Sequence, residues 1–189
     1  MSTARFGVQL RAEMADDTLR GHASVFNQVA KVPGGWEQVD RSAFDAVLAD
    51  PETDVRAFIN HDHNLLLGRQ SVGTLRISVD SEGLPFEVDL PDTSYANDLR
   101  ELVDRGDLDG ASFGFVPGDD ELSRAPDGRQ LRTHTNVRAL IDVSAVTFPA
   151  YDGADVALRN YTFSASTRGQ LIRARSRVLI ANHTTGDSK

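Results

Sequence analysis

The stretch 72-VGTLRISVDSEGLPFEVDL-90 decides the fold class, because it contains the clearest β-hairpin signal in the chain. Residues 72–80 and 84–90 each have the composition of a strand, and the Ser-Glu-Gly turn at 81–83 separates them. Two such runs on either side of a short glycine-containing turn are predicted to pair as antiparallel neighbours. The fold around this hairpin should therefore be rich in antiparallel sheet.

Strand signals extend outward from this hairpin in both directions. Two N-terminal segments, 4–10 and 19–26, are predicted to be strands joined by a polar turn. Further strands are expected at 55–60, at 110–117 and within the long extended stretch 129–149. Strands therefore dominate the chain.

Two short helices are predicted between the strands. The first covers 43–48, begins at a Ser42 cap and ends at Asp50-Pro51. The second begins at Asp92 or Thr93 and closes at Arg105-Gly106. Their apolar faces are expected to consist of Phe44, Val47 and Leu48 in the first helix, and of Tyr95, Leu99, Leu102 and Val103 in the second.

These elements together predict a mainly β, α+β fold: a closed or nearly closed antiparallel β-barrel with flanking helices. No βαβ unit with a glycine-rich phosphate loop is present, so nucleotide chemistry is not expected. The chain has 189 residues, enough for one domain and a tail. We place the domain at 1–155 and a basic tail at 156–189, since 159–189 has six basic side chains and a single acidic one.

The composition excludes several classes of function. With a net charge of −8, the chain lacks the basic surface that phosphates require, so no nucleic-acid partner is expected. The absence of cysteine excludes disulfides, thiolate metal sites and cysteine catalysis. No apolar run has the length of a membrane span, and the N-terminus has no signal-peptide hydrophobic region. The sequence therefore predicts a soluble, cytoplasmic protein without a membrane partner.

Two segments contain the residue types of nucleophilic catalysis. In 110-GASFGFVP-117, Ser112 follows Gly110 and Ala111, small residues that would let a substrate carbonyl approach the backbone. A serine hydroxyl is a weak nucleophile until a base takes its proton. His61, at the polar end of a predicted strand, is the candidate for that base. The alternative is an ordinary serine on a glycine-flanked strand.

A third residue should orient the histidine and stabilise its cation. Asp142 lies in the otherwise apolar segment 139-ALIDVSAVTF-148, where an unpaired carboxylate is costly to bury. His134 is the rival third member, and a solvent-facing Asp142 would have no such role. Strand alternation puts Asp142, Ser144 and Val146 on one face and Ile141, Val143 and Ala145 on the other.

A metal site is the competing interpretation of the histidines. His61 and His63 are spaced to face the same side of a strand and could share an ion. Such a site needs at least one more ligand, for which His22 and His134 are available. Residues in a surface turn are the simpler explanation of the same pair.

Taken together, several stretches resemble, in the same order, those of the prohead or capsid-maturation serine proteases of tailed phages, which are distantly similar to the herpesvirus protease assemblin. The resemblance covers roughly residues 5–155, and NHD…LGR with G-x-SFGF is its most specific part. The matching stretches are 21-GHASVFN-27, 41-RSAF-44, 60-NHD-62, 67-LGR-69, 71-SVGTLRI-77, 82-EGL-84, 104-DRGDLDGASFGF-115 and 139-ALIDVSAVTFPAY-151.

This resemblance implies a set of site residues. The family's histidine falls on His61, its nucleophile on Ser112 and its late carboxylate on Asp142. The family motif at the third position usually contains Glu-Val-Ser, so the carboxylate here is one methylene shorter. Assemblin uses a second histidine instead, which keeps His134 as the alternative. The implied fold is a mostly β barrel flanked by helices.

The resemblance also implies a serine endopeptidase that works without a metal or organic cofactor. Its implied partners are scaffolding segments and the delta-like domain of the major capsid protein, cut in the host cytoplasm inside the assembling prohead. The same resemblance implies that the protease cuts itself and works as a homodimer. It also implies that the tail 156–189 is a packaging segment or a self-cleaved segment. The alternative is a catalytically inactive capsid-assembly or scaffold module of the same fold, which a wide separation of His61 and Ser112 would favour.

Overall fold

The computed structural model describes residues 4–8, 13–15, 17–32, 35–125 and 127–149. The predicted tail 156–189 and the predicted domain boundary lie outside these residues. The strands are β1 (Ala4–Val8), β2 (Glu13–Ala15), β3 (Thr18–Val25), β4 (Ala30–Val32), β5 (Gly35–Val39), β6 (Arg56–Ile59), β7 (Asp62–Arg69), β8 (Leu75–Ile77), β9 (Gly83–Asp89), β10 (Gly110–Pro117), β11 (Asp120–Arg124), β12 (Gln130–His134) and β13 (Val137–Val146). The helices are α1 (Asp45–Ala49), α2 (Ser94–Asp104) and the 3₁₀ helices η1 (Arg41–Phe44) and η2 (Gln70–Val72).

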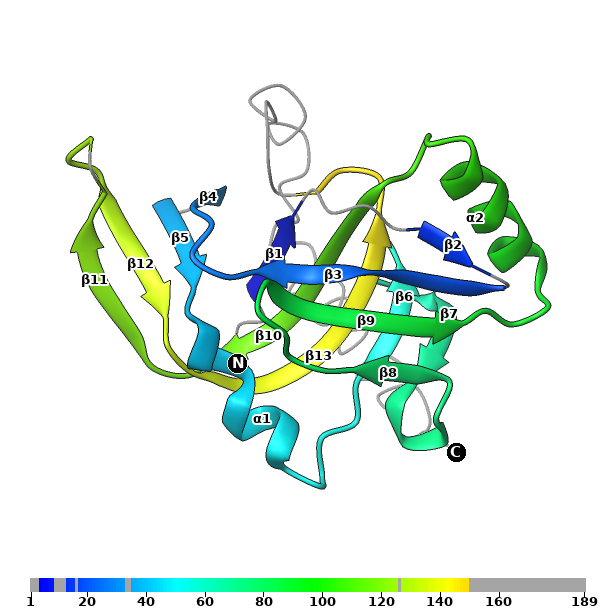
Figure 1. The fold of residues 1–189 in the computed structure, drawn as a ribbon, viewed down its shortest axis with the longest axis horizontal. Coiled ribbons are helices and arrows are strands. Elements are labelled where there is room, and N and C mark those ends of the chain that lie inside the picture. Colours follow the sequence, from blue (N-terminus) through cyan, green and yellow to red (C-terminus); the bar gives the residue numbers. More distant parts are fainter. Residues whose placement is uncertain (1–3, 9–12, 16, 33–34, 126, 150–189) are drawn as a thin grey trace, which may run out of the picture. The chain divides into compact units, whose positions relative to one another are not determined.

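The described strands form three sheets (Figure 1). A five-stranded sheet has the order β1-β10-β13-β6-β7, and two four-stranded sheets have the orders β2-β3-β9-β8 and β11-β12-β5-β4. The chain passes from the third sheet to the first twice, from β5 to β6 and from β12 to β13. Because both passages run in the same direction, the pairings of β12 with β5 and of β13 with β6 are parallel.

The mainly β, α+β class is confirmed, but the expected closed or nearly closed antiparallel barrel is not. None of the three sheets in the described part of the chain closes on itself, and two of the pairings are parallel. The strand signals in the sequence were mostly right. Which strands would pair, and whether the outer ones would meet, depends on connections between sheets that alternation does not encode.

The hairpin that decides the fold class is present as β8 and β9, with Leu75 opposite Val88. Its turn is stabilised by Asp80, whose Oδ1 accepts hydrogen bonds from the backbone N–H groups of Glu82 and Gly83 at 2.7 and 2.8 Å. The two predicted N-terminal strands are present as β1 and β3, and they pair with different neighbours. β1 pairs with β10, whereas β3 pairs with β2 and β9.

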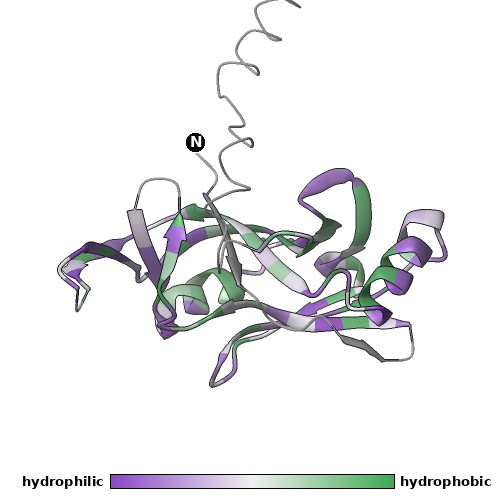
Figure 2. Cartoon of the chain, turned by 90° about the horizontal axis from the view of Figure 1, so that it is seen from above, coloured by the Kyte–Doolittle hydropathy of each residue, from purple (hydrophilic) through white to green (hydrophobic). Residues whose placement is uncertain are grey.

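Both predicted helices exist, and α2 has Thr93 at its N-cap and ends at Arg105-Gly106, as predicted. Asp40, not Ser42, caps η1, because its carboxylate accepts the backbone N–H of Ser42 at 2.9 Å. In α2 the buried residues are Ala96, Leu99 and Val103, whereas the predicted core residue Leu102 is 39% exposed. Figure 2 shows both hydrophobic and polar positions on α2, as expected for an amphipathic helix.

The core is centred on β10, which lies between β1 and β13 in the five-stranded sheet. Phe113 and Phe115 of β10 are fully buried, with ring centroids 4.9 Å apart. Phe44 of η1 meets the Phe113 ring edge-on at 5.5 Å. β10 is therefore held from both edges and from one face, which makes it a rigid support for the side chains on its other face.

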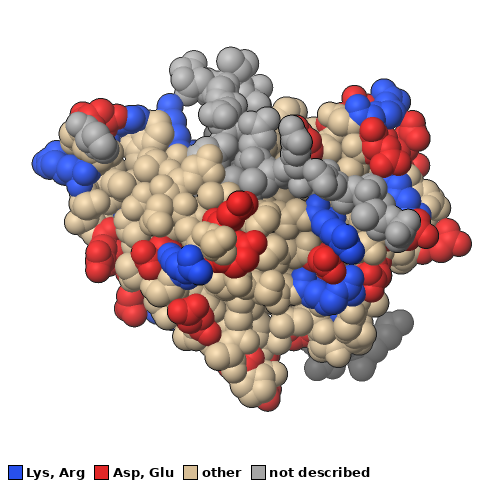
Figure 3. Space-filling view, in the orientation of Figure 1, with Lys and Arg blue, Asp and Glu red and all other residues tan. Residues whose placement is uncertain are grey.

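On the face seen in Figure 3, lysine and arginine side chains lie among acidic ones, without a broad basic surface among the residues drawn in colour. Within the described ranges, no helix has both the length and the hydrophobicity needed to cross a membrane.

Candidate active site

Ser112 lies in the middle of β10, on the strand that the core holds most firmly. Its Cα pairs with that of Ser144 on β13, and the residue is only 5% exposed. Strand alternation points Phe113 into the core, so Ser112 and Gly114 share the opposite face of the sheet. The predicted nucleophile is thus on a rigid element and on the face away from the phenylalanines.

His61 is the second residue of a tight turn, not the end of a strand as the sequence predicts. β6 ends at Ile59 and β7 begins at Asp62, which leaves Asn60 and His61 as a two-residue loop. Their φ angles are 50° and 56°, the left-handed values that a type I′ hairpin requires at both central positions. Because β6 runs parallel to β13, this turn lies beside the end of β13.

The three predicted site residues form one hydrogen-bonded triad. His61 Nε2 is 2.9 Å from Ser112 Oγ, and His61 Nδ1 is 2.5 Å from Asp142 Oδ2. With an ionised Asp142, Nδ1 carries the proton and donates it to the carboxylate, so Nε2 is the acceptor for the serine hydroxyl. This is the geometry in which a histidine can act as a base toward serine.

Asp142 is nearly fully buried, at 3% exposure, so its charge needs partners. His61 Nδ1 donates to Oδ2, and Ser144 Oγ donates to the same oxygen at 2.8 Å. Ser144 is itself 1% exposed. A carboxylate that accepts two hydrogen bonds in a dry site keeps a fixed orientation, and it fixes the histidine ring in turn.

Gly114 explains how the shorter aspartate is accommodated. Its Cα pairs with that of Asp142, and a Cβ at Gly114 would stand 2.3 Å from Asp142 Oδ1. The carboxylate therefore occupies the space that a side chain on β10 would fill. A glycine at this position lets Asp142 lie flat against the neighbouring strand, within reach of His61.

The small residues before Ser112 have a different role from the predicted one. Ala111 is fully buried, and a Cβ at Gly110 would stand 2.7 Å from the Val146 carbonyl oxygen. Other atoms of the protein fill the space around both residues, so no space for a substrate carbonyl remains there.

His134, the alternative third residue, is not the hydrogen-bond partner of His61 Nδ1. Its Nε2 lies 2.9 Å from Glu37 Oε2, and its ring packs edge-on against Phe115. His134 is 1% exposed, so it pairs with Glu37 in the interior. The structure brings Asp142 to His61 and keeps His134 elsewhere.

Asp62, the sequence neighbour of His61, is also engaged elsewhere. Its Oδ1 accepts hydrogen bonds from the backbone N–H and the side-chain amide of Asn64, at 2.9 and 2.8 Å. The backbone hydrogen bond from Asn64 is the main cause that lowers the pKa of Asp62. This carboxylate stabilises the start of β7 and does not orient the imidazole.

The predicted metal pair is not assembled. Both ring nitrogens of His61 are taken by Asp142 and Ser112, and His63 packs its ring on Phe58 at 5.0 Å. His22 pairs with Asp80 at 2.9 Å. Within the residues that the structure describes, no group of three or more His, Cys, Asp or Glu side chains could hold a metal ion.

Strand alternation failed at one position near the site. The ladder between β10 and β13 shifts between Gly114 and Phe115, so Leu140 rather than Ile141 lies opposite Phe115. A bulge of this kind re-aims a side chain and locally disrupts the ladder, and the register shifts again between Val116 and Pro117. Asp142 and Ser144 still share a face, as the sequence predicts.

Three residues that support the triad are not predicted from the sequence to be part of the site. Strand alternation predicts that Ser144 lies on the same face as Asp142. The i, i+2 spacing of the two residues is the signal that could have identified Ser144 as a partner of the carboxylate. Asn60 could have been found because Asn is enriched at positive φ, and Gly114 because a glycine inside a strand often marks a close approach.

Two comparisons with known proteins give matches. A family model described as caudovirus prohead serine protease matches residues 7–168. The prohead protease of Enterobacteria phage HK97 is 32% identical over 139 residues, which are 72% of this chain and 57% of that protein. The chain therefore aligns with a little over half of that relative's length. No solved structure gives a significant match.

Proposed function

We propose, because this chain belongs to the caudovirus prohead serine protease family, that it is a serine endopeptidase acting in phage capsid maturation. The observation that carries the proposal is the triad of Ser112, His61 and Asp142, joined at 2.9 and 2.5 Å. These are the three positions at which the family's histidine, nucleophile and carboxylate are expected.

The proposed mechanism begins with His61 Nε2 taking the proton of Ser112 as Oγ attacks a peptide carbonyl carbon. The tetrahedral intermediate collapses, the C–N bond breaks, and the imidazolium gives its proton to the departing amine. The C-terminal fragment leaves with the new amino group, and the N-terminal fragment stays as an ester on Ser112.

In the second half, a water molecule gives a proton to His61 Nε2 and attacks the ester carbonyl. Collapse of this intermediate releases the carboxylic acid and returns the proton to Ser112. Asp142 stays ionised throughout, holding the Nδ1–H tautomer and stabilising the imidazolium. Ser144 keeps its hydrogen bond to Asp142 in both halves. Neither half requires a metal or an organic cofactor.

We infer that the substrates are scaffolding segments and the major capsid protein of the same phage, cut inside the assembling prohead in the host cytoplasm. Self-cleavage would then act on the basic tail 156–189, and a homodimer would be the working form. The name of the HK97 relative, a prohead protease, supports the first of these inferences.

The test is co-expression with the major capsid protein encoded by the same genome, followed by mass spectrometry of the products. We expect the wild-type chain to cut the capsid protein and its own tail, and Ser112→Ala to cut neither. Ser24→Ala is the matched control, because Ser24 is another fully buried strand serine, outside the triad. It should retain cleavage.

Unchanged cleavage by Ser112→Ala would contradict the proposal. Absence of cleavage in every variant would favour the inactive assembly module. That alternative receives no support from the geometry, since His61 and Ser112 lie within hydrogen-bonding distance.

A further inference from the structure

Asn60 is the first residue of the turn between β6 and β7, and His61 is the second. Both Asn60 and His61 have φ angles in the left-handed region. Asparagine and histidine are among the few non-glycine residues that adopt this region readily, so the dipeptide suits the turn. The backbone conformation alone, however, does not tie the turn to the rest of the site.

Three hydrogen bonds make that connection. The backbone N–H of Asn60 donates to the Ala145 carbonyl at 2.8 Å. The side-chain Oδ1 accepts the backbone N–H of Thr147 at 3.0 Å, and Nδ2 donates to Thr147 Oγ1 at 3.3 Å. The side-chain pair, hereafter the Asn60–Thr147 clamp, joins the turn to the residue that follows β13.

The clamp is relevant to the triad because the His61 ring must form hydrogen bonds to residues on two different strands. Its ring bonds to Ser112 on β10 and to Asp142 on β13, and both bonds depend on where the turn lies. β13 carries Asp142, so a clamp to the end of β13 fixes the base relative to its own carboxylate. A displacement of about 1 Å in a catalytic group can cost about 100-fold in rate.

We propose that Asn60 is a positioning residue for His61, acting through the Asn60–Thr147 clamp. This inference rests on the proposed peptidase function, because it assigns the clamp a role in the same reaction. Asn60 touches neither the hydroxyl nor the carboxylate of the triad. It determines how often His61 lies where both of its hydrogen bonds can form.

Asn60→Gly isolates the clamp, because glycine adopts positive φ freely and keeps the backbone bond to Ala145. Asn60→Asp retains the acceptor for the Thr147 N–H but loses the donor to Oγ1. Asn27→Gly is the matched control. Asn27 is also exposed, also has a positive φ, of 56°, and also donates its backbone N–H to a strand carbonyl, that of Val39.

The probe is a fluorophosphonate, which reacts with an activated serine without requiring a known substrate. We expect Asn60→Gly to lower the maximal labelling rate of Ser112 about tenfold, with little change in the apparent affinity for the probe. Asn60→Asp should recover part of the loss, and Asn27→Gly should label like the wild type. Thermal melting checks that all four proteins are folded.

A second readout does not require chemistry. The far-downfield proton NMR signal of the His61–Asp142 hydrogen bond should be present in the wild type and weaker or exchange-broadened in Asn60→Gly. Wild-type labelling and an unchanged signal in folded Asn60→Gly would overturn the inference. A wild-type chain that shows this signal but is never labelled would instead contradict the proposed function.

Discussion

Ser144 links the two strands that carry the site, because its Cα pairs with that of Ser112 and its hydroxyl bonds to Asp142. The hydroxyl donates to the same carboxylate oxygen that accepts His61 Nδ1. It therefore helps to keep the nearly buried Asp142 carboxylate oriented. Hydrogen bonds to charged groups contribute more than neutral ones, about 1.5–3 kcal/mol.

Replacing Ser144 by alanine should lower the cleavage rate about 10- to 100-fold, because it leaves a buried carboxylate with one donor fewer. The measurement is the fluorophosphonate labelling rate at Ser112, with circular dichroism as the check on folding. Ser144→Thr keeps the hydroxyl and should recover part of the rate. Equal rates for Ser144→Ala and wild type would show that His61 alone suffices to hold Asp142.

At the residue scale, the sequence predicts the triad but not its support. The order of the stretches around His61, Ser112 and Asp142 pointed to these three residues. Ser144 acts through Asp142, two residues away on the same strand, whereas Asn60 acts through Thr147, which the pairing of β6 with β13 brings close. The turn type at residues 60–61 and the pairing of β6 with β13 were not readable from local composition, so the role of Asn60 was not predicted.

Among the elements, the β10–β13 pair sets the shape of the site. Gly114→Ala would place a Cβ 2.3 Å from Asp142 Oδ1, so either the carboxylate or the strand must move. We expect a loss of about 1–3 kcal/mol in the free energy of unfolding, as for other overpacked positions. Labelling of Ser112 should fall as well, because Asp142 can no longer lie against β10.

A double-mutant cycle tests this explanation. In an Asp142→Ala background the oxygen that would clash is absent, so Gly114→Ala should destabilise the protein much less, as measured by urea unfolding. The same loss in both backgrounds would mean that the strain arises elsewhere in β10.

The η1 cap gives a second prediction at this scale. Asp40→Ala should lower the free energy of unfolding by about 1 kcal/mol at pH 7, because it removes the acceptor for the Ser42 N–H. Ser42→Ala, which removes the residue predicted from sequence as the cap, should have a smaller effect. A larger loss from Ser42→Ala would contradict the assignment.

The same cap should depend on pH in a defined direction. The side-chain hydrogen bond from Ser42, with its backbone N–H, lowers the pKa of Asp40 below its usual value. A lowered folded-state pKa stabilises the protein above the unfolded carboxyl pKa, about 3.9, and that contribution is lost as the pH falls through the folded value. The difference between wild type and Asp40→Ala should therefore shrink below about pH 4.

β7 is one of several strands that the sequence did not predict. Its first half, Asp62 to Asn64, is polar and exposed, which is typical of a loop. The pairing with β6 is also irregular, since Phe58 lies opposite Leu66 while Ile59 lies opposite Asp62. A strand that bulges and faces solvent has no alternating pattern to recognise.

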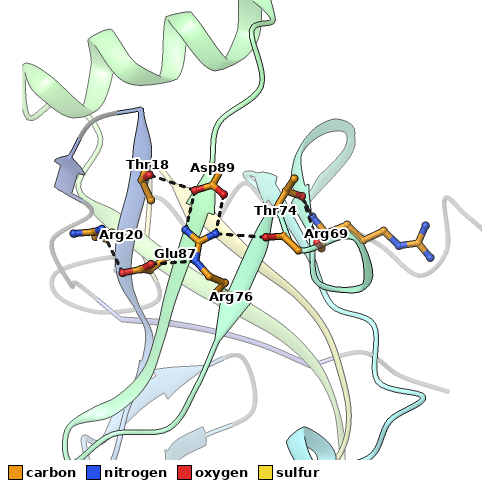
Figure 4. A network of polar contacts seen from close by, with 8 residues as sticks. Thr18, Arg20, Arg69, Thr74, Arg76, Glu87 and Asp89 are labelled. Atoms are coloured by element: carbon orange, nitrogen blue, oxygen red, sulfur yellow. Dashed lines mark hydrogen bonds and ion pairs between the residues drawn. The ribbon is translucent and has the colours of Figure 1, made fainter.

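For the whole molecule, core packing should dominate over surface charge. Phe113→Ala removes a fully buried ring between Phe44 and Phe115 and should cost about 3–5 kcal/mol. Arg76 pairs with Asp89 and Glu87 at 2.7 and 3.1 Å in the network of Figure 4, yet its side chain is 46% exposed. Arg76→Ala should cost less than about 1 kcal/mol, and less still at high salt.

Urea unfolding of the two variants checks this ranking. A larger loss for Arg76→Ala would mean that the charged network, which spans β3, β8 and β9, is a main stabiliser of its sheet. This possibility is worth testing because the three sheets have open edges, where a strand lacks a hydrogen-bonded neighbour on one side. In the closed barrel that the sequence suggested, every strand would have had a hydrogen-bonded neighbour on both sides. Side-chain contacts would then have mattered less for holding the strands together.

The central claim is that Asp142, through His61, activates Ser112. Its most direct test is the rate of fluorophosphonate labelling at Ser112, located by peptide mass spectrometry, in wild type, Asp142→Asn and Asp62→Asn. We predict a loss of about 10³- to 10⁴-fold for Asp142→Asn, as when the carboxylate of a Ser-His-Asp triad is neutralised, and no change for Asp62→Asn. Labelling at another residue, or an equal rate in wild type and Asp142→Asn, would contradict the claim.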